Sequence, residues 1–174
     1  MKYFVKFIVV TFFSLICTNI FADEKIAVLD LSYVLNESKA GKNAQEFLQK
    51  TFNENQKKFL EVSESLKKEE TDLLAKKNIL SKEEYGKKMN TLRKRNIDYQ
   101  TQRRTSIDKL TTSRAKARET LLNKIIPIVE AYTKENDILV VLDKKSILGG
   151  NPKIDITKII VEKLNKDLPS LNLK

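Results

Sequence analysis

Histidine and tryptophan are absent from this 174-residue chain, and its single cysteine, Cys17, lies near the N-terminus. Without histidine, and with no cysteine after residue 17, the sequence excludes Ser-His catalysis, His or Cys metal sites and a thiol nucleophile in the main part of the chain. Only 4 glycines and 3 prolines occur, and 7% of the residues are aromatic. This composition disfavours a loop-rich sandwich or barrel, whereas 32% charged residues is typical of long exposed helices. We expect no enzymatic activity, no metal and no cofactor.

Long apolar runs are also lacking, except near the N-terminus. Lys2 and Lys6 precede an apolar run at residues 7–16, and a more polar stretch ends at Ala22, which is the order of a secretion signal. The run is about ten residues long, and a helix needs roughly 20 to cross a bilayer. We therefore expect export and cleavage near Ala22. An uncleaved anchor and a lipoprotein modified at Cys17 remain alternatives.

A heptad pattern occupies the middle of the chain. Ten positions from 48 to 80, separated alternately by four and three residues, hold seven apolar side chains. This spacing predicts one limb of a coiled coil. Ser81 and Glu84 then have the spacing of a capping box, so a second helix is expected to start there.

The second helix is predicted to return along the first and to end near Ile125. Its apolar stripe is weaker and includes Arg103 and Ser106, so looser packing is expected along this limb. Pro127 should kink the helix or restart it, because proline lacks the backbone donor of an interior helical residue. The two limbs together predict an antiparallel helical hairpin.

Apolar runs of β character flank the predicted hairpin. Residues 25–31 predict one strand, residues 138–142 predict a buried strand, and residues 146–148 suggest a further short one. Asp155 is expected to cap a last helix at 156–167. Strands at both ends imply that the ends meet. The predicted fold class is α+β, with a long hairpin projecting from a small β-rich body.

This interpretation divides the chain into a signal peptide, residues 1–22, a body, residues 23–38 and 126–174, and an inserted hairpin, residues 39–125. A body of about 60 residues buries little surface and leaves its sheet edges unpaired. We therefore expect self-association through the strands. The candidate assembly residues are Ile26, Val28, Leu29, Leu139, Val140 and Val141.

Positive charge is concentrated on the returning limb. Residues 42–80 carry 8 lysines and 7 acids, net +1, whereas residues 81–120 carry 12 basic and 5 acidic residues, net +7. Such a surface attracts acidic partners. Nucleic acid is not expected, because few aromatic side chains accompany the charge. Anionic lipid surfaces, acidic unfolded polypeptides and a solvated face without a ligand all stay open. The candidate binding residues are Lys87, Lys88, Arg93, Lys94, Arg95, Arg103 and Arg104.

The chain after residue 22 contains, in order, KIAVLDL, SYVLNESKAGKNAQEFL, a long charged hairpin, ILVVLDKKSIL and GGNPKIDITKIIVEKLN. This order resembles the Skp/OmpH family of periplasmic chaperones over essentially the whole of that length. The resemblance implies a homotrimer with a barrel-like body and three hairpins around a cavity. It also implies a periplasmic protein that holds unfolded outer-membrane proteins without ATP.

A structural or adaptor coiled-coil protein of the cell envelope is the alternative. The two functions differ in their partners. A chaperone should bind many unfolded β-barrel proteins and ignore their folded forms, whereas an adaptor should prefer one folded partner.

Overall fold

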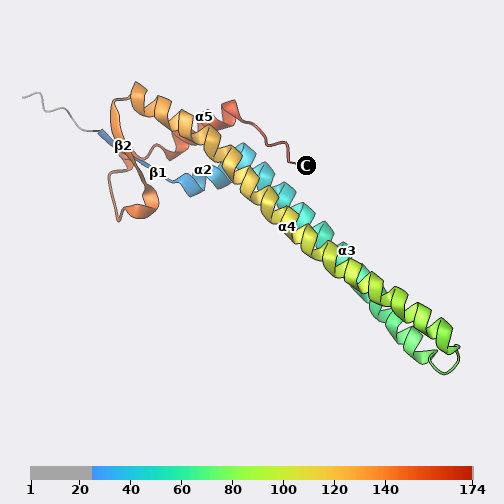
Figure 1. Cartoon of the computed structure of the whole chain (residues 1–174). Coiled ribbons are helices and arrows are strands. Elements are labelled where there is room, and N and C mark those ends of the chain that lie inside the picture. The colour runs from blue at the N-terminus through green and yellow to red at the C-terminus, as the bar shows by residue number, and fades with distance from the viewer. Residues whose placement is uncertain (1–24, 174) are drawn as a thin grey trace, which may run out of the picture.

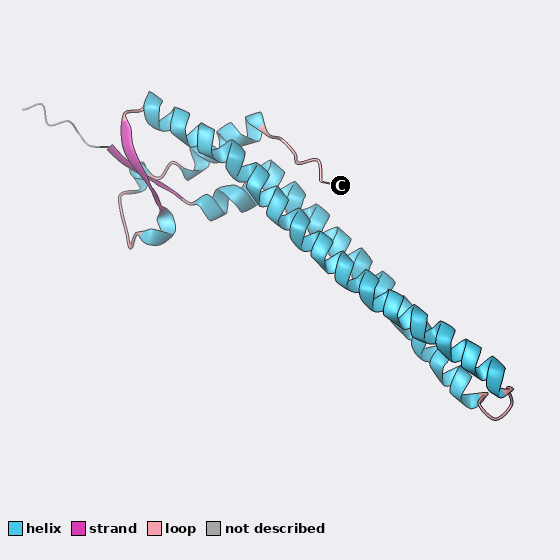
Figure 2. Ribbon diagram, in the orientation of Figure 1, coloured by secondary structure: helices cyan, strands magenta, loops and turns pink. Residues whose placement is uncertain are grey.

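The computed structural model describes residues 25–173, so the predicted secretion signal at 1–22 lies outside the described residues. Two long helices, α3 (Lys39–Ala75) and α4 (Lys82–Glu135), form an arm that projects from a small body (Figure 1). Among residues 25–173, the strands lie in the body (Figure 2). The body contains β1 (Lys25–Leu29), α2 (Leu31–Glu37), β2 (Ile138–Asp143), two 3-10 turns, η1 (Lys144–Ser146) and η2 (Pro152–Ile154), and α5 (Thr157–Asp167). Within residues 25–173, no helix combines the length and apolar character needed to cross a bilayer.

β1 and β2 pair in parallel and form the two-stranded sheet of the body. The other edge of β1 is bridged by the segment before α5, where the Ile156 backbone N–H donates to the Val28 carbonyl at 2.9 Å. The short strand expected at 146–148 is wrong. Lys144–Ser146 instead forms the turn η1, because the Asp143 carboxylate caps it by accepting from the Lys145 backbone N–H at 3.0 Å.

The core of the body lies where α2, α4 and α5 pack against the sheet. Its buried side chains come from both ends of the chain, so the body is complete only once the arm has returned. These side chains are Ala27, Leu29, Val34, Leu35, Ala40, Leu121, Ile125, Ile128, Ile156, Ile160 and Leu164.

β2 is much less buried in this chain than its sequence predicted. Leu139 is 69% exposed, Val140 43% and Leu142 39%, and only Ile138 and Val141 pack against the core. The register accounts for this pattern. Lys25 aligns with residue 138 but the next residue of β1 aligns with 140, so Leu139 has no partner and the alternation shifts by one position.

The predicted end of the second helix near Ile125 is also wrong. α4 continues as a helix through Pro127 and ends at Glu135. Pro127 is exposed, while Ile125 and Ile128 on either side of it are buried in the body core at 1% and 9% exposure. Tertiary packing therefore holds the helix together across a residue that weakens it locally.

The predicted seam of the arm is present in α3. Leu48, Leu66 and Leu73 are buried, and most of the other seam positions are half-buried. Phe59 packs edge-to-face against Tyr99, with ring centroids 6.0 Å apart, and the Glu69 carboxylate binds the Arg95 guanidinium nearer the tip. α3 and α4 therefore run antiparallel along the arm.

The predicted capping box at the start of α4 is confirmed. The Ser81 hydroxyl accepts from the Glu84 backbone N–H at 3.2 Å, and the Glu84 carboxylate accepts from the Ser81 backbone N–H at 3.1 Å. The hydrogen bonds from Ser81 lower the pKa of the Glu84 carboxyl. The box satisfies two donors at the tip of the arm, where the chain reverses.

The arm joins the body at a tight elbow between α2 and α3. Ser38 is fully buried there, and its hydroxyl accepts from the Gly41 backbone N–H at 3.2 Å. Gly41 lies so close to the end of α2 that a Cβ atom on it would be 2.0 Å from the Leu35 carbonyl oxygen. Only glycine fits this crossing without a backbone shift.

We expect Gly41→Ala to lower the free energy of unfolding by about 1–3 kcal/mol, because the backbone has to move to admit the methyl group. Gly86→Ala is the matched control, since nothing lies within 4 Å of a Cβ at this helical position. Gly86→Ala should raise the free energy of unfolding by about 0.5–1 kcal/mol, because alanine has the higher helix propensity. Urea unfolding at equal chain concentration measures both. Similar effects of the two substitutions would contradict the tight crossing.

A polar network fixes the start of α5. The Asp155 carboxylate binds the Lys144 ammonium at 2.7 Å and accepts from the Thr157 backbone N–H at 2.9 Å. The Thr157 hydroxyl in turn accepts from the Asp30 backbone N–H at 2.9 Å. The last helix is present as predicted, but Asp155 is not its N-cap: α5 starts at Thr157, and its N-cap residue is Ile156, which makes no side-chain cap hydrogen bond.

Burial alone would raise the pKa of the Asp155 carboxyl, but the hydrogen bonds from Lys144 and Thr157 outweigh it and lower the pKa from 3.8 to about 2. The ionised carboxylate therefore stabilises the fold above about pH 4, and this contribution is lost as the pH falls toward 2. We expect Asp155→Asn to unfold at lower urea than the unsubstituted chain at pH 6, and the difference to shrink by pH 2.5. A difference that stays constant between these pH values would contradict the assignment.

Candidate interaction surface of the arm

The seven basic residues predicted as a binding surface all lie exposed on α4, but they do not form one cluster. The Lys87 ammonium binds the Glu83 carboxylate at 2.6 Å on the same helix, and Arg95 binds Glu69 on α3. Exposed pairs of this kind contribute little to stability. They do reduce the net field around the distal part of α4. Of the seven, Arg103 alone lines the groove in the middle of the arm.

This mid-arm groove is a space of about 700 Å³ between α3 and α4. Aromatic and aliphatic side chains form much of its lining, with amides, hydroxyls and two cationic side chains between them. The apolar members are Phe52, Phe59, Leu60, Tyr99, Ile107 and Leu110, and the cationic members are Lys57 and Arg103.

The mid-arm groove opens where polar residues interrupt the seam. Asn55 on α3 and Arg103 and Ser106 on α4 occupy seam positions, and all three line the groove. Buried clusters lie on either side of it, the body core at one end and Leu66, Leu73, Leu92 with their neighbours toward the tip. The looser packing expected at residues 103 and 106 is thus where the groove lies.

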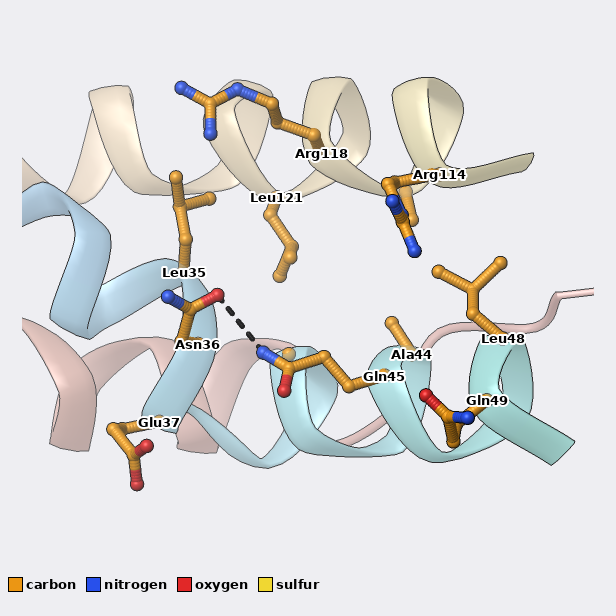
Figure 3. Close-up of a pocket in the computed structure, with 12 residues that line it drawn as sticks. Leu35, Asn36, Glu37, Ala44, Gln45, Leu48, Gln49, Arg114, Arg118 and Leu121 are labelled. Carbon is orange, nitrogen blue, oxygen red and sulfur yellow. Dashed lines mark hydrogen bonds between the residues drawn. The ribbon is translucent and has the colours of Figure 1, made fainter. Parts of the chain in front are cut away.

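A second groove of about 650 Å³, the basal groove, lies where the arm meets the body. Leu35, Leu48 and Leu121 line it, and the Gln45 side-chain amide donates to the Asn36 side-chain oxygen at 2.9 Å across one wall. Figure 3 shows Arg114 pointing into the space between the helices, whereas Arg118 extends along the outer side of α4.

Both grooves open on the same side of the arm. Their walls include residues that directly follow a seam position, such as Leu60 after Phe59 on α3 and Ile107 after Ser106 on α4. In two helices that run past each other in opposite directions, such residues point to one common side. The basal groove repeats the pattern with Gln49 on α3. One face of the arm therefore carries apolar, amide and cationic side chains in series.

The candidate assembly residues separate into two groups. Val28 and Leu29 are buried within the single chain at 3% and 7% exposure, and Val141 packs against the body core. Ile26, Leu139 and Val140 are exposed. Ile26 and Val140 are paired in the register of the sheet. A role in assembly stays a prediction, and these three exposed residues are the ones that can be tested without disturbing the core.

Sequence reasoning missed the apolar walls of the mid-arm groove. Leu60 and Ile107 lie one position outside the predicted seams and are 60% and 55% exposed. An aliphatic residue next to a seam position is a usable signal, because such positions are normally polar in a two-helix arm. Within residues 25–173, no cluster of three or more His, Cys, Asp or Glu side chains is positioned to hold a metal.

The fold places this chain among proteins in which a long helical arm projects from a small α+β body. Residues 25–164 match the sequence profile of the family described as outer membrane protein (OmpH-like). The chain is 25% identical over 170 residues to a Skp-like protein of Pseudomonas aeruginosa PAO1, covering 95% of this chain and 99% of the relative. It is 31% identical over 140 residues to an uncharacterized protein of Aquifex aeolicus VF5, covering 80% and 85% of the two chains.

A solved structure has the same fold. It is the crystal structure of a candidate outer membrane chaperone (OmpH-like) from Caulobacter crescentus CB15, with a TM-score of 0.78 at 18% identity over 84% of this chain and 87% of that one. The family match spans most of the described residues, and the Aquifex relative exceeds 30% identity. This chain therefore belongs to the OmpH-like family.

Proposed function

We propose that this protein is an ATP-independent holdase of the periplasm, which binds unfolded outer-membrane β-barrel proteins and keeps them soluble on their way to the outer membrane. The observation that carries the proposal is the mid-arm groove, an open and partly apolar surface on an arm, and the Caulobacter structure with the same fold is described as a candidate outer membrane chaperone. The secretion signal expected at residues 1–22 supports the location.

The chemistry of an unfolded β-barrel suits this surface. Its strands alternate apolar and polar side chains, and the apolar ones aggregate in water when they are not paired. Phe52, Leu60 and Ile107 offer exposed contacts that require no specific sequence. Many weak contacts of this kind hold a client without trapping it, so release needs no nucleotide.

We infer further that the protein assembles as a homotrimer through the sheet of the body. The outer face of the sheet exposes Ile26, Val140 and Leu142, and within the described residues β2 has a strand partner on one side only. An exposed apolar edge strand is normally covered in the native assembly. Three copies would surround a shared cavity with their arms. The basic residues of α4 make anionic lipid surfaces a second class of partner.

Light scattering coupled to size exclusion tests the assembly and the holdase activity together. We expect a mass of about three chains for the protein alone. After a urea-unfolded porin is diluted into it, one porin should remain soluble in the complex. A folded porin should not bind. A stable assembly that lets the unfolded porin precipitate would favour the envelope adaptor instead.

The double substitution Leu139→Asp with Val140→Asp tests the predicted interface. Both side chains are exposed in the single chain, so the charges should disrupt assembly without entering the core, and the mass should fall to that of one chain. Ile97→Asp is the control, because Ile97 is a 58% exposed aliphatic residue on the arm. An assembly that survives the double substitution would place the interface elsewhere.

A further inference from the structure

The lining of the mid-arm groove specifies a type of client segment, and this inference rests on the proposed holdase function. We propose that the groove binds extended polypeptide in which a carboxylate side chain lies two residues from an aromatic one. Arg103 pairs with the carboxylate, and the aromatic side chain packs against Tyr99 and its neighbours.

The charge of the groove is of one sign. Lys57 and Arg103 are its charged lining residues, and no carboxylate lines it. Across residues 25–173, neither cation takes part in an ion pair, in contrast to Arg95, which Glu69 neutralises. A concave surface with apolar walls concentrates the field of such charges. An Arg guanidinium matches a carboxylate in a bidentate geometry, so it is selective as well as attractive.

The apolar part of the groove lies beside the charge. Tyr99 and Phe59 form an edge-to-face pair with an interplanar angle of 69°, and Phe52 is 41% exposed at the same groove. Aromatic side chains favour further edge-to-face or offset contacts with such rings. A client aromatic side chain that stacks there gains more binding free energy than its buried area alone provides.

The spacing of these groups matches that of an extended client. Tyr99 and Arg103 are separated by four residues of helix, which corresponds to a rise of about 6 Å. In an extended chain, side chains on the same face are two residues apart and separated by about 6.6 Å. A segment with an acid and an aromatic residue at alternate positions therefore presents both groups to one face at the spacing that the groove offers.

Arg104 provides a matched control for Arg103. The two arginines are neighbours on α4, carry the same charge and are both exposed, but Arg104 does not line the groove. Any loss of long-range attraction affects Arg103→Gln and Arg104→Gln alike. A specific contact in the groove affects Arg103→Gln alone.

The experiment measures the fluorescence anisotropy of labelled peptides with the full chain, at one fixed salt concentration. The probe contains Asp-Ser-Phe, and its controls contain Asn-Ser-Phe or place Asp and Phe next to each other. We expect Arg103→Gln to weaken binding of the Asp-Ser-Phe peptide about tenfold and to leave the Asn-Ser-Phe peptide within twofold. Arg104→Gln should change neither by more than twofold.

Equal losses of affinity for the Asp-Ser-Phe peptide in the two variants would overturn the proposal. So would an unsubstituted protein that binds the control peptides as tightly as the probe. So would peptide binding that weakens as the protein concentration rises, because a second copy would then occupy the groove. Circular dichroism and mass confirm that both variants fold and assemble. If the unsubstituted protein keeps porin soluble but the two substitutions change peptide affinity equally, only this inference is disproved. A protein that lets porin precipitate disproves the holdase function.

Discussion

Parallel pairing of β1 with β2 is the constraint that determines the path of the rest of the chain. Parallel strands cannot be joined by a tight turn, because the connection has to return to the end at which the first strand began. Here the connection is the whole arm, since the paired residues Lys25 and Ile138 are 138 − 25 = 113 positions apart. The arm is thus a very long crossover between two adjacent strands.

This constraint also explains why the two long helices differ in length. α3 has 37 residues and α4 has 54, so α4 is longer by 54 − 37 = 17 residues, or about 25 Å of helix. β1 spans about 17 Å and α2 about 10 Å. The sum of these two lengths is the distance that α4 has to cover beside the body before β2 can start next to Lys25. A helix that stopped near Ile125 would have left β2 at the wrong end of the sheet.

The features predicted correctly from the sequence depend on local signals. The seam of α3 and the Ser81–Glu84 capping box follow from spacings of three and four residues within one helix. Pro127 is a local signal too, but α4 does not restart there and continues to Glu135. Proline removes one hydrogen bond, whereas the packing of Ile125 and Ile128 in the body core holds both flanking turns in place. Sequence alone does not reveal that a core formed by distant segments lies against this turn.

The grooves could be predicted only in part, because they depend on which residues of α3 face which residues of α4. Polar residues at seam positions, such as Arg103, indicate that the packing is loose, but they do not indicate what surrounds the opening. The match between the helices is fixed on both sides of the opening by buried clusters, the body core at the base and Leu66, Leu73 and Leu92 toward the tip. Those two anchors place Leu60 and Ile107 on opposite walls of one groove.

Stability and accessibility oppose each other in the same seam. A large apolar residue in place of Arg103 or Ser106 would bury more surface and stabilise the pairing of the helices. It would also fill the space where Phe52 and Tyr99 are now accessible, and at position 103 it would remove a cation from the groove. The buried clusters at the two ends, in the body and around Leu73, hold the helices together on both sides of the opening. The arm therefore remains paired at its ends, and the unfilled middle of the seam is the part left accessible.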